Sequence, residues 1–365
     1  MPGRPGATLA GKGRTRCTSA RKPVFWYGSV QMNENRIEST APRGRPSLAA
    51  ILERLDEEVS LLRDRLGGLP RAVEADHVLR EIWLDDVHHS TAIEGNTMTR
   101  AQVADLVDQG RASGTLFESA EVKGYADAAD WVYRNASQYH GVPVSVVSEV
   151  HKVALELAWT VQPPATRDRP GSWRTSPVQV GSLKVTLPAA IPADLATWSR
   201  STTDPAGRHP IIHAAVHHAW FERIHPFVDG NGRVGRLILN FMLIQQGYPP
   251  AVILRSQRSR YLRALRLADD GNPDALAEVI ARAVSGALTR FLIPNLAGEA
   301  KLIPLSALAS RGPYSPEYLR KLVVAGKLRA IRDGHLWLSS RAWLADYMAR
   351  RDPRGGRPKS RSRKG

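Results

Sequence analysis

Apolar residues recur every three to four positions through most of the chain, which is the spacing of helices that each bury one face. A proline-rich stretch at 162–171 and a segment at 174–187 with a different spacing interrupt this pattern. The pattern therefore predicts a mainly α-helical fold with one non-helical insertion. We place the helices at 47–66, 76–94, 100–109, 118–137, 143–159, 192–202, 209–224, 233–246, 255–269 and 273–293.

The segment 174–187 has apolar residues at alternating positions on either side of a Gly181-Ser182 turn. Such alternation predicts two short strands, and hence a lone β-hairpin in a chain that is otherwise helical. A surface hairpin without a function is the alternative interpretation, since short hairpins are common connectors. The alternating residues are Val178, Val180, Leu183, Val185 and Leu187.

Residues 302–349 follow a stretch punctuated by proline and have the pattern of a separate small module. Two serine-capped helix starts, the second at Ser315-Pro316, precede two short strands around Asp333-Gly334. This order resembles a winged helix-turn-helix of the excisionase or MerR-like type, which implies contact with duplex DNA. The alternative is a protein-interaction or regulatory module with the same fold. The resemblance places Tyr318, Arg320 and Lys321 in a major groove and Arg329 and Arg332 on phosphates.

The 365 residues carry a net charge of +16, but the excess is concentrated at the two ends. Residues 1–50 contain 9 Lys/Arg against 2 Asp/Glu, and residues 341–365 also contain 9 against 2. The 290 residues between them hold 33 basic and 31 acidic groups, so the body of the protein is nearly neutral. We therefore expect basic, disordered tails at 1–45 and 350–365.

Three domains are expected between these tails: an N-terminal helical region at 46–110, a helical core at 111–296, and the module at 302–349. Cys17 is the only cysteine, which excludes an intramolecular disulfide framework and favours the reducing cytoplasm. No apolar run is long enough to span a membrane, so no membrane association is expected.

The stretch from His225 to Arg236 concentrates groups that suit a Mg-bound triphosphate. His225 titrates near neutrality and can accept a proton, and Asp229 is a hard oxygen ligand for Mg²⁺. Arg233 and Arg236 can grip phosphates, while the glycines let backbone N–H groups approach phosphate oxygens. The apolar run that follows is a predicted helix, whose N-terminus also favours anions. The stretch therefore predicts a nucleotide site.

Two other interpretations of the same residues are weaker. Gly230, Gly232 and Gly235 match a dinucleotide-binding pattern, but that pattern requires a preceding strand and the segment before it has helical spacing. The second is a plain Gly-Asn-Gly turn between two helices with arginines on the surface. Agreement at eight specified positions makes this chance interpretation the poorer one.

The stretch resembles the Fic-domain signature H-x-F-x-[DE]-G-N-G-R-x-x-R and departs from it at no specified position. Most Fic proteins are helical enzymes that transfer AMP from ATP to a hydroxyl of a target protein. The resemblance implies that His225 is the general base, Asp229 the Mg²⁺ ligand and Phe227 an anchor of the loop. Members with relaxed motifs perform other chemistry, such as kinase-like phosphate transfer. The implied phosphate and nucleotide contacts are Asp229, Gly230, Asn231, Gly232, Arg233, Val234, Gly235 and Arg236.

A second segment, Ser90 to Asn96, resembles the inhibitory motif [ST]-x-x-x-E-[GN] of self-inhibited Fic proteins. Gly95 is a stop signal, so Glu94 is expected in the last turn of the helix at 76–94, where the helix dipole disfavours a carboxylate. The resemblance implies that Glu94 pairs with Arg236 and blocks the position of the γ-phosphate. An ordinary solvent-facing glutamate is the alternative.

The hairpin resembles the Fic flap, which implies that a target protein docks there by strand addition. Val180, Gly181 and Ser182 would then lie nearest the nucleotide. Fic proteins often place a tyrosine such as Tyr261 near adenine, although core packing explains that residue equally well.

The function expected from these features is a self-inhibited protein adenylyltransferase with ATP as substrate and Mg²⁺ as cofactor. Its expected partners are ATP and a target protein, with a homodimer and duplex DNA as further candidates. One alternative is a DNA-binding regulator that uses the Fic core as a nucleotide sensor. Another is an enzyme that removes AMP, with Glu94 positioning a water molecule.

Overall fold

The computed structural model describes residues 46–65, 76–112, 114–181, 183–293, 301–310, 312–333 and 335–350. The predicted tails at 1–45 and 350–365 lie outside these residues, except for Arg350 at the end of the last helix. Ser182 and Gly334 also lie outside them.

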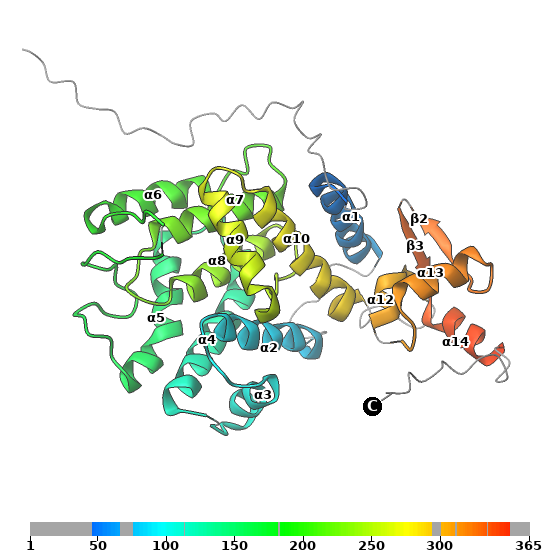
Figure 1. Cartoon of the computed structure of the whole chain (residues 1–365), viewed down its shortest axis with the longest axis horizontal. Helices are drawn as coiled ribbons and strands as arrows, with labels where there is room; N and C mark the ends of the chain where they lie inside the picture. Colours follow the sequence, from blue (N-terminus) through cyan, green and yellow to red (C-terminus); the bar gives the residue numbers. More distant parts are fainter. Residues whose placement is uncertain are drawn as a thin grey trace, which may run out of the picture. The chain divides into compact units, whose positions relative to one another are not determined.

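The prediction of a mainly helical fold is confirmed, and each predicted helix has a counterpart (Figure 1). Local capping sets several boundaries. Thr115 and Glu118 form a capping box, so the helix predicted at 118–137 begins earlier, at Leu116. The helices and helical turns are α1 (Leu48–Ser60), η2 (Leu61–Arg65), α2 (Asp76–Ile93), α3 (Arg100–Gln109), α4 (Leu116–Asn135), η3 (Ala136–Gln138), α5 (Val144–Val161), η4 (Pro188–Ala190), α6 (Ile191–Ser201), α7 (Pro210–Ile224), α8 (Asn231–Gln245), η5 (Arg255–Gln257), α9 (Arg258–Asp269), α10 (Asp274–Ala287) and η6 (Leu288–Leu292).

Helix α8 is the centre of the helical body, because nearly every residue along it is buried. It packs against α4, α5 and α7, and α2 reaches it as well. Its apolar residues face several sides and so require this enclosure, and its polar residues such as Arg233 and Arg236 are buried with them. The N-terminus of α8 is thereby held between several elements that are distant in the sequence.

Helix α2 is attached to this body by buried polar contacts as well as by apolar packing. Trp83 donates its indole N–H to the carbonyl oxygen of Ala126 in α4 at 3.1 Å. Asp86 accepts a hydrogen bond from Tyr133 of α4 at 3.0 Å and one from Asn240 of α8 at 3.3 Å. These contacts fix the position and rotation of α2, and therefore the position of its C-terminal end.

The predicted hairpin at 174–187 is only partly formed. The described residues of this segment contain one isolated bridge, between Val180 and Leu183, with a hydrogen bond of 2.9 Å from the N–H of Leu183 to the carbonyl of Val180. No strand is assigned to them. A two-stranded hairpin without a neighbouring strand is marginal in water, which explains a tight turn in place of extended strands.

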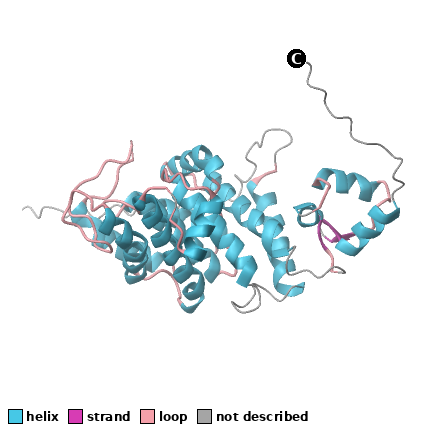
Figure 2. Ribbon diagram, turned by 90° about the horizontal axis from the view of Figure 1, so that it is seen from below, coloured by secondary structure: helices cyan, strands magenta, loops and turns pink. Residues whose placement is uncertain are grey.

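Strands among the described residues belong to one small sheet in the C-terminal region (Figure 2). The predicted order of two helices followed by a hairpin is present, and Ser315 caps the second helix as expected. The first strand and the last helix were not predicted. The sheet order is β1-β3-β2 with antiparallel pairing. The elements are β1 (Ile303–Pro304), α12 (Leu305–Ser310), α13 (Pro316–Val324), β2 (Ile331–Asp333), β3 (Leu336–Ser339) and α14 (Arg341–Arg350).

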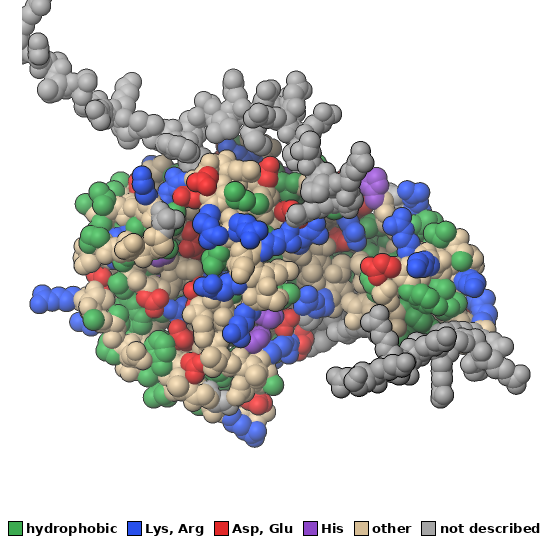
Figure 3. Space-filling model, viewed as in Figure 1, with side chains coloured by type: hydrophobic (Ala, Val, Ile, Leu, Met, Phe, Trp, Pro, Cys, Tyr) green, Lys and Arg blue, Asp and Glu red, His purple; other side chains and the backbone are tan. Residues whose placement is uncertain are grey.

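Basic side chains gather on the face formed by α9 and α10 (Figure 3). Part of this charge is compensated locally, because Arg260 and Arg282 both contact Glu278 at 2.8 Å. In the part of the chain that the structure describes, no helix combines the length and the apolar character needed to cross a membrane.

Candidate active site

The loop between α7 and α8 carries the first half of the motif. His225 follows the last residue of α7 and has a φ of 49°, which is unusual for a residue other than glycine. Phe227 behind it is fully buried. Gly230 has a φ of 81° and caps α8, which begins at Asn231, two residues earlier than predicted. The turn between α7 and α8 is therefore defined by two residues with positive φ, one at each end.

Two side chains hold this loop from inside. Asn231 donates to the carbonyl of Phe227 at 2.8 Å and accepts from its N–H at 2.9 Å. His151 of α5 stacks on Phe227 at 3.6 Å between ring centroids. Its Nδ1 accepts from the Gly171 N–H at 2.7 Å, so its Nε2 donates to the carbonyl of Asp229 at 3.1 Å. Burial lowers the pKa of His151 to about 4, which keeps the ring neutral and this tautomer fixed.

His225 is oriented to act as a base. Its Nδ1 lies 3.1 Å from the carbonyl oxygen of Glu222, and a carbonyl can only accept. The proton of the neutral ring is therefore on Nδ1, and the lone pair of Nε2 is free to accept another. Burial also lowers the pKa of His225 below its usual value, so the ring is neutral at pH 7.

Asp229 lies two residues before the start of α8 and remains open to solvent, with a side-chain exposure of 52%. One oxygen accepts from the Gly230 N–H at 2.6 Å and the other contacts Arg233 at 3.0 Å. The described residues contain no group of three or more His, Cys, Asp or Glu side chains that could form a metal cage. A single accessible carboxylate does suit Mg²⁺, which usually takes only one or two from the protein.

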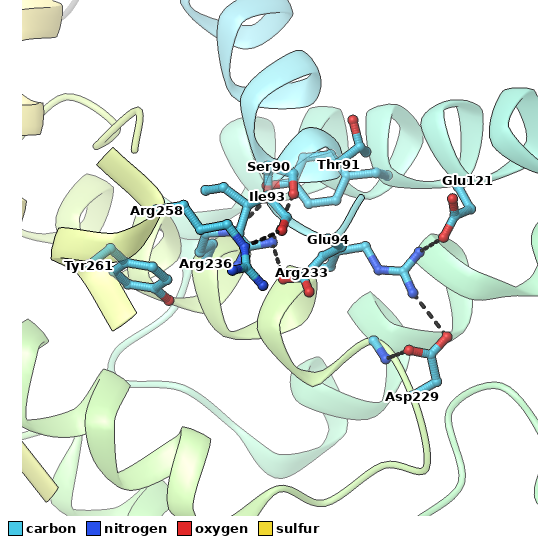
Figure 4. A network of polar contacts seen from close by, with 12 residues as sticks. Ser90, Thr91, Ile93, Glu94, Glu121, Asp229, Arg233, Arg236, Arg258 and Tyr261 are labelled. Carbon is cyan, nitrogen blue, oxygen red and sulfur yellow. Dashed lines mark hydrogen bonds and ion pairs between the residues drawn. The ribbon is translucent and has the colours of Figure 1, made fainter. Parts of the chain in front are cut away.

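Arg236 is held by the C-terminal end of α2 (Figure 4). Its guanidinium contacts Glu94 at 2.8 Å and donates to the hydroxyl and the carbonyl of Ser90 at 2.7 and 3.0 Å. Arg258 donates to the carbonyl of Ile93 at 2.8 Å. Glu94 itself lies one residue beyond α2, not within its last turn, because the helix already ends at Ile93. The sequence-based pairing of Glu94 with Arg236 is thus present in the geometry.

Gly232 makes room for this contact. A Cβ atom at this position would lie 2.5 Å from a carboxylate oxygen of Glu94, so no other residue fits without displacing it. The carboxylate therefore sits directly against the first turn of α8. This is where the free backbone N–H groups and the helix dipole favour negative charge.

Arg233, one turn earlier on α8, points to a different carboxylate. It contacts Glu121 of α4 at 2.6 Å and Asp229 at 3.0 Å, as Figure 4 shows. Its side chain is only 4% exposed, and its Nε–H is buried without a partner among the described residues. Burial raises the pKa of Glu121, and the nearby Arg233 opposes that effect.

Three residues of the predicted nucleotide set lie in the interior. Val234 is fully buried and its N–H is bonded to the carbonyl of Gly230 within the helix. Gly235 faces Glu222 and His218. Tyr261 is 1% exposed and its hydroxyl lies 2.7 Å from Nε2 of His218, so its ring packs in the interior. Contact of these three residues with a nucleotide stays a prediction.

The segment predicted as a hairpin is attached at its base to the loop between α7 and α8. Arg174 is buried, and its guanidinium donates to the carbonyls of His225, Ser176 and Thr186. Its backbone N–H donates to the carbonyl of Pro226 at 2.9 Å. At the tip, Val180 is half-buried and Gly181 is exposed, while Ser182 lies outside the described residues. Their proximity to a nucleotide stays a prediction.

The residues predicted to contact DNA are accessible. Tyr318, Arg320 and Lys321 are exposed on α13. Arg329 lies over the ring of Trp343 at 4.4 Å and Arg332 over that of Trp337 at 5.9 Å. Nothing further bears on DNA contact, which stays a prediction.

Sequence reasoning did not assign roles to four residues that shape this site: Ser90, Glu121, His151 and Arg174. Ser90 lies within the segment that resembles the inhibitory motif, so its contact with Arg236 was open to inference. The other three come from α4, α5 and the flap base, and no local signal distinguishes them from ordinary surface or core residues.

The fold and the site together define a helical domain with a glycine-containing turn before a buried helix, a histidine oriented to accept a proton, and a carboxylate placed against the second arginine of the motif. Residues 143–243, which run from α5 through the flap and the motif to α8, match the Fic/DOC family. The chain therefore contains a Fic domain.

The chain is also similar to proteins named protein adenylyltransferase Fic. It is 29% identical over 281 residues to that of Drosophila willistoni and 30% identical over 282 residues to that of Drosophila mojavensis. These alignments cover 73% of this chain and 54% and 53% of the relatives, so the chain spans about half the length of the curated relatives it matches.

Solved Fic structures have the same fold. Fic-1 of C. elegans (residues 134–508) aligns with a TM-score of 0.57 and 26% identity, covering 67% of this chain and 73% of that one. A Fic domain containing signaling protein from Bacteroides thetaiotaomicron aligns with a TM-score of 0.55 and 23% identity, covering 66% and 96%.

Proposed function

We propose that this chain is a protein adenylyltransferase that is held inactive by Glu94. The observation that carries the proposal is the 2.8 Å contact between Glu94 and Arg236, the last residue of an intact Fic signature. Similarity to proteins named for the adenylyltransferase activity favours AMP transfer over AMP removal and over a nucleotide-sensing DNA regulator.

In this reaction ATP binds at the N-terminus of α8, and a hydroxyl of the target protein approaches His225. Nε2 of His225 takes the hydroxyl proton while the oxygen attacks the α-phosphorus. The new P–O bond to the target forms as the bond to the β-phosphate oxygen breaks, and pyrophosphate leaves. The neutral ring and the fixed tautomer of His225 suit this task, since the base must be unprotonated before each turnover.

Stabilisation of the phosphate charge falls to the arginines and to the first turn of α8. Arg233 has a buried N–H without a partner among the described residues, which an anionic oxygen would satisfy. Asp229 is the residue that would hold Mg²⁺. When bound, that ion would neutralise charge on the phosphates and help to orient them.

Inhibition follows from competition for Arg236. The Glu94 carboxylate binds the Arg236 guanidinium and fills the space next to Gly232. A phosphate that binds Arg236 or enters that space must therefore displace the carboxylate. Glu94 is 36% exposed and lies in a turn, so its side chain can rotate away without unfolding α2.

The flap is proposed to present the target. Arg174 at the start of the flap donates to the carbonyl of His225. A peptide paired with the flap would therefore be held in a fixed position relative to the His225 side chain, the general base. Backbone pairing of this kind would recognise an extended segment more than particular side chains.

The test is Mg-dependent labelling of host lysate with ATP carrying a tracer on either the α- or the γ-phosphate. Wild type, Glu94→Gly and Glu94→Gly/His225→Ala are compared. Label from the α-position alone, strongest in Glu94→Gly and absent from the double variant, is expected. Label from the γ-position would replace AMP transfer by kinase-like chemistry. No label in any sample, with ATP still bound, would favour the sensor.

A further inference from the structure

Glu121 stands out among the carboxylates of the helical body because it is largely buried and lies close to the candidate site without a part in the reaction described above. It lies on α4, and one of its oxygens is 2.6 Å from Nη1 of Arg233. Its side chain is 15% exposed and that of Arg233 is 4% exposed. Removal of a carboxylate from water in this way is costly unless its partner is well placed.

The position of Glu121 is fixed by the body of the protein. Helix α4 packs along α5 and also contacts α2 and α8. The second carboxylate oxygen of Glu121 receives the side-chain amide of Asn96 at 3.4 Å, and Asn96 also donates to the carbonyl of Glu118 at 3.1 Å. Glu121 therefore has none of the freedom of Glu94, which lies in a turn and is 36% exposed.

Arg233 thus has two carboxylate partners of different kinds. Glu121 is buried and fixed, whereas Asp229 has a side-chain exposure of 52% and lies at the end of a loop. Asp229 is also the residue proposed to hold Mg²⁺, and it cannot give the same oxygen fully to a metal ion and to an arginine. A buried arginine that loses its only counter-ion is strongly destabilised, so without Glu121 it would compete for Asp229.

We propose that Glu121 is a positioning residue that serves as the permanent counter-ion of Arg233 and so frees Asp229 for Mg²⁺. This inference rests on the proposed function, because it assigns the metal to Asp229. The Nη1 of Arg233 stays on Glu121, while Nη2 and the unpartnered Nε–H remain for phosphate oxygens. Glu121 acts through Arg233 and Asp229 and does not itself touch the nucleotide.

The effect of removing the Glu121 charge has a direction that a merely structural role would not produce. In Glu121→Gln the side chain keeps its shape and can still accept from Arg233, but Asp229 becomes the only charged partner. The Mg²⁺ concentration needed for ATP binding is expected to rise by about tenfold or more. Binding of ATP in the absence of Mg²⁺ is expected to stay equal or to become tighter, since a negative charge near the triphosphate is gone.

The experiment is calorimetric titration of ATP into full-length protein carrying Glu94→Gly, across a series of Mg²⁺ concentrations and in EDTA. Glu121→Gln and Glu121→Asp are each added to this background. The control is Asp127→Asn, which removes an exposed carboxylate of the same helix that pairs with Lys123. Glu121→Asp keeps the charge and is expected to need less Mg²⁺ than Glu121→Gln, while the control is expected to match the background.

An unchanged Mg²⁺ requirement in Glu121→Gln would overturn the inference and leave the proposed function standing. Equal weakening of ATP binding with and without Mg²⁺, with a lowered melting temperature, would also overturn it, because that is the result of a structural role. Failure of the Glu94→Gly background itself to bind ATP under any condition would instead refute the proposed function, and the inference with it.

Discussion

Arg233 and Arg236 lie one turn apart on the same buried helix, and each forms an ion pair with a carboxylate from another element. The two ion pairs differ in how easily the carboxylate can leave the arginine. Arg236 contacts Glu94, which is 36% exposed and lies just beyond the end of α2. Arg233 contacts Glu121, which is 15% exposed and lies within α4. Similar chemistry at the two arginines can thus give a removable lock in one case and a fixed support in the other.

The ease with which an ion pair can open depends on the element that carries each partner as much as on the distance between the partners. The two contacts, of 2.8 and 2.6 Å, are nearly equal. Rotation of Glu94 needs only an exposed side chain in a turn to move, whereas withdrawal of Glu121 would break its contacts with both Arg233 and Asn96 in a largely buried position. Substitution of the two carboxylates should therefore have different consequences.

The largest effect is expected from His225, because the contrast between the two arginines matters only if the chemistry occurs at this residue. In the Glu94→Gly background, His225→Ala should lower α-phosphate labelling by about 10²- to 10⁴-fold through loss of the general base. His140→Ala removes an exposed histidine and should leave labelling unchanged. Comparable labelling by both variants would place the reacting group elsewhere.

Substitution of the two carboxylates should change labelling differently. Glu94→Gly should raise labelling by at least about tenfold, because Arg236 becomes available to phosphate. Glu121→Gln in the wild-type background should give no increase. Labelling rates at saturating Mg²⁺ measure both. If Glu121→Gln activates the protein as Glu94→Gly does, both carboxylates are inhibitory and the contrast between lock and support is wrong.

Glu222 is a third buried or partly buried carboxyl group of this region, and it lies near Arg236. Burial raises its pKa from 4.5 to about 7, and one of its oxygens is buried without a partner among the described residues. Since the folded pKa exceeds the unfolded one, folding favours the protonated form. The stabilisation is complete below pH 4.5 and is lost as the pH rises through about 7.

In the wild type, the free energy of unfolding should fall by roughly 3 kcal/mol over this pH range because of Glu222. In Glu222→Gln this fall should be absent. Urea denaturation at several pH values between 4.5 and 8 measures it. Parallel pH profiles of wild type and variant would show that Glu222 is charged in the folded protein. Arg236 would then have a second counter-ion, and its ion pair with Glu94 would be weaker.

Ser90 tests how much of the hold on Arg236 comes from α2 itself. Ser90→Ala leaves the Nε–H of a buried guanidinium without its acceptor, which should lower the free energy of unfolding by about 2 kcal/mol. Labelling should rise, but less than in Glu94→Gly. Thr160→Ala removes an exposed hydroxyl that bonds within its own helix and should change stability by less than about 0.5 kcal/mol. Equal stability of the two variants would show that Ser90 does not help to hold Arg236.

The smallest effect concerns pH. Because the pKa of His225 is lowered below 6.5, the base is already neutral at pH 7. Labelling by Glu94→Gly should therefore change by less than about twofold between pH 7 and 8 and should fall only at pH values below 6.5. A steep rise between pH 7 and 8 would mean that the base is protonated at neutrality.

Much of the local structure was open to prediction. Helical spacing located the helices of the body, and capping residues such as Thr115 and Gly230 then moved their ends by a few residues. The signature at 225–236 is contiguous, so its chemistry was also legible. The hairpin at 174–187 was overestimated, because alternation describes which residues suit a strand but does not supply the neighbouring strand that would stabilise it.

The sequence alone therefore determined the helical class, the turn at the start of α8 and the kind of ligand that this turn suits, because these depend on residues close together along the chain. The tertiary structure decided which groups face that turn. Glu121 lies 112 positions from Arg233 and Ser90 lies 146 positions from Arg236. Only the packing of α4 and α2 on α8 brings them together, since that packing reflects the burial of many apolar side chains at once and no single spacing encodes it.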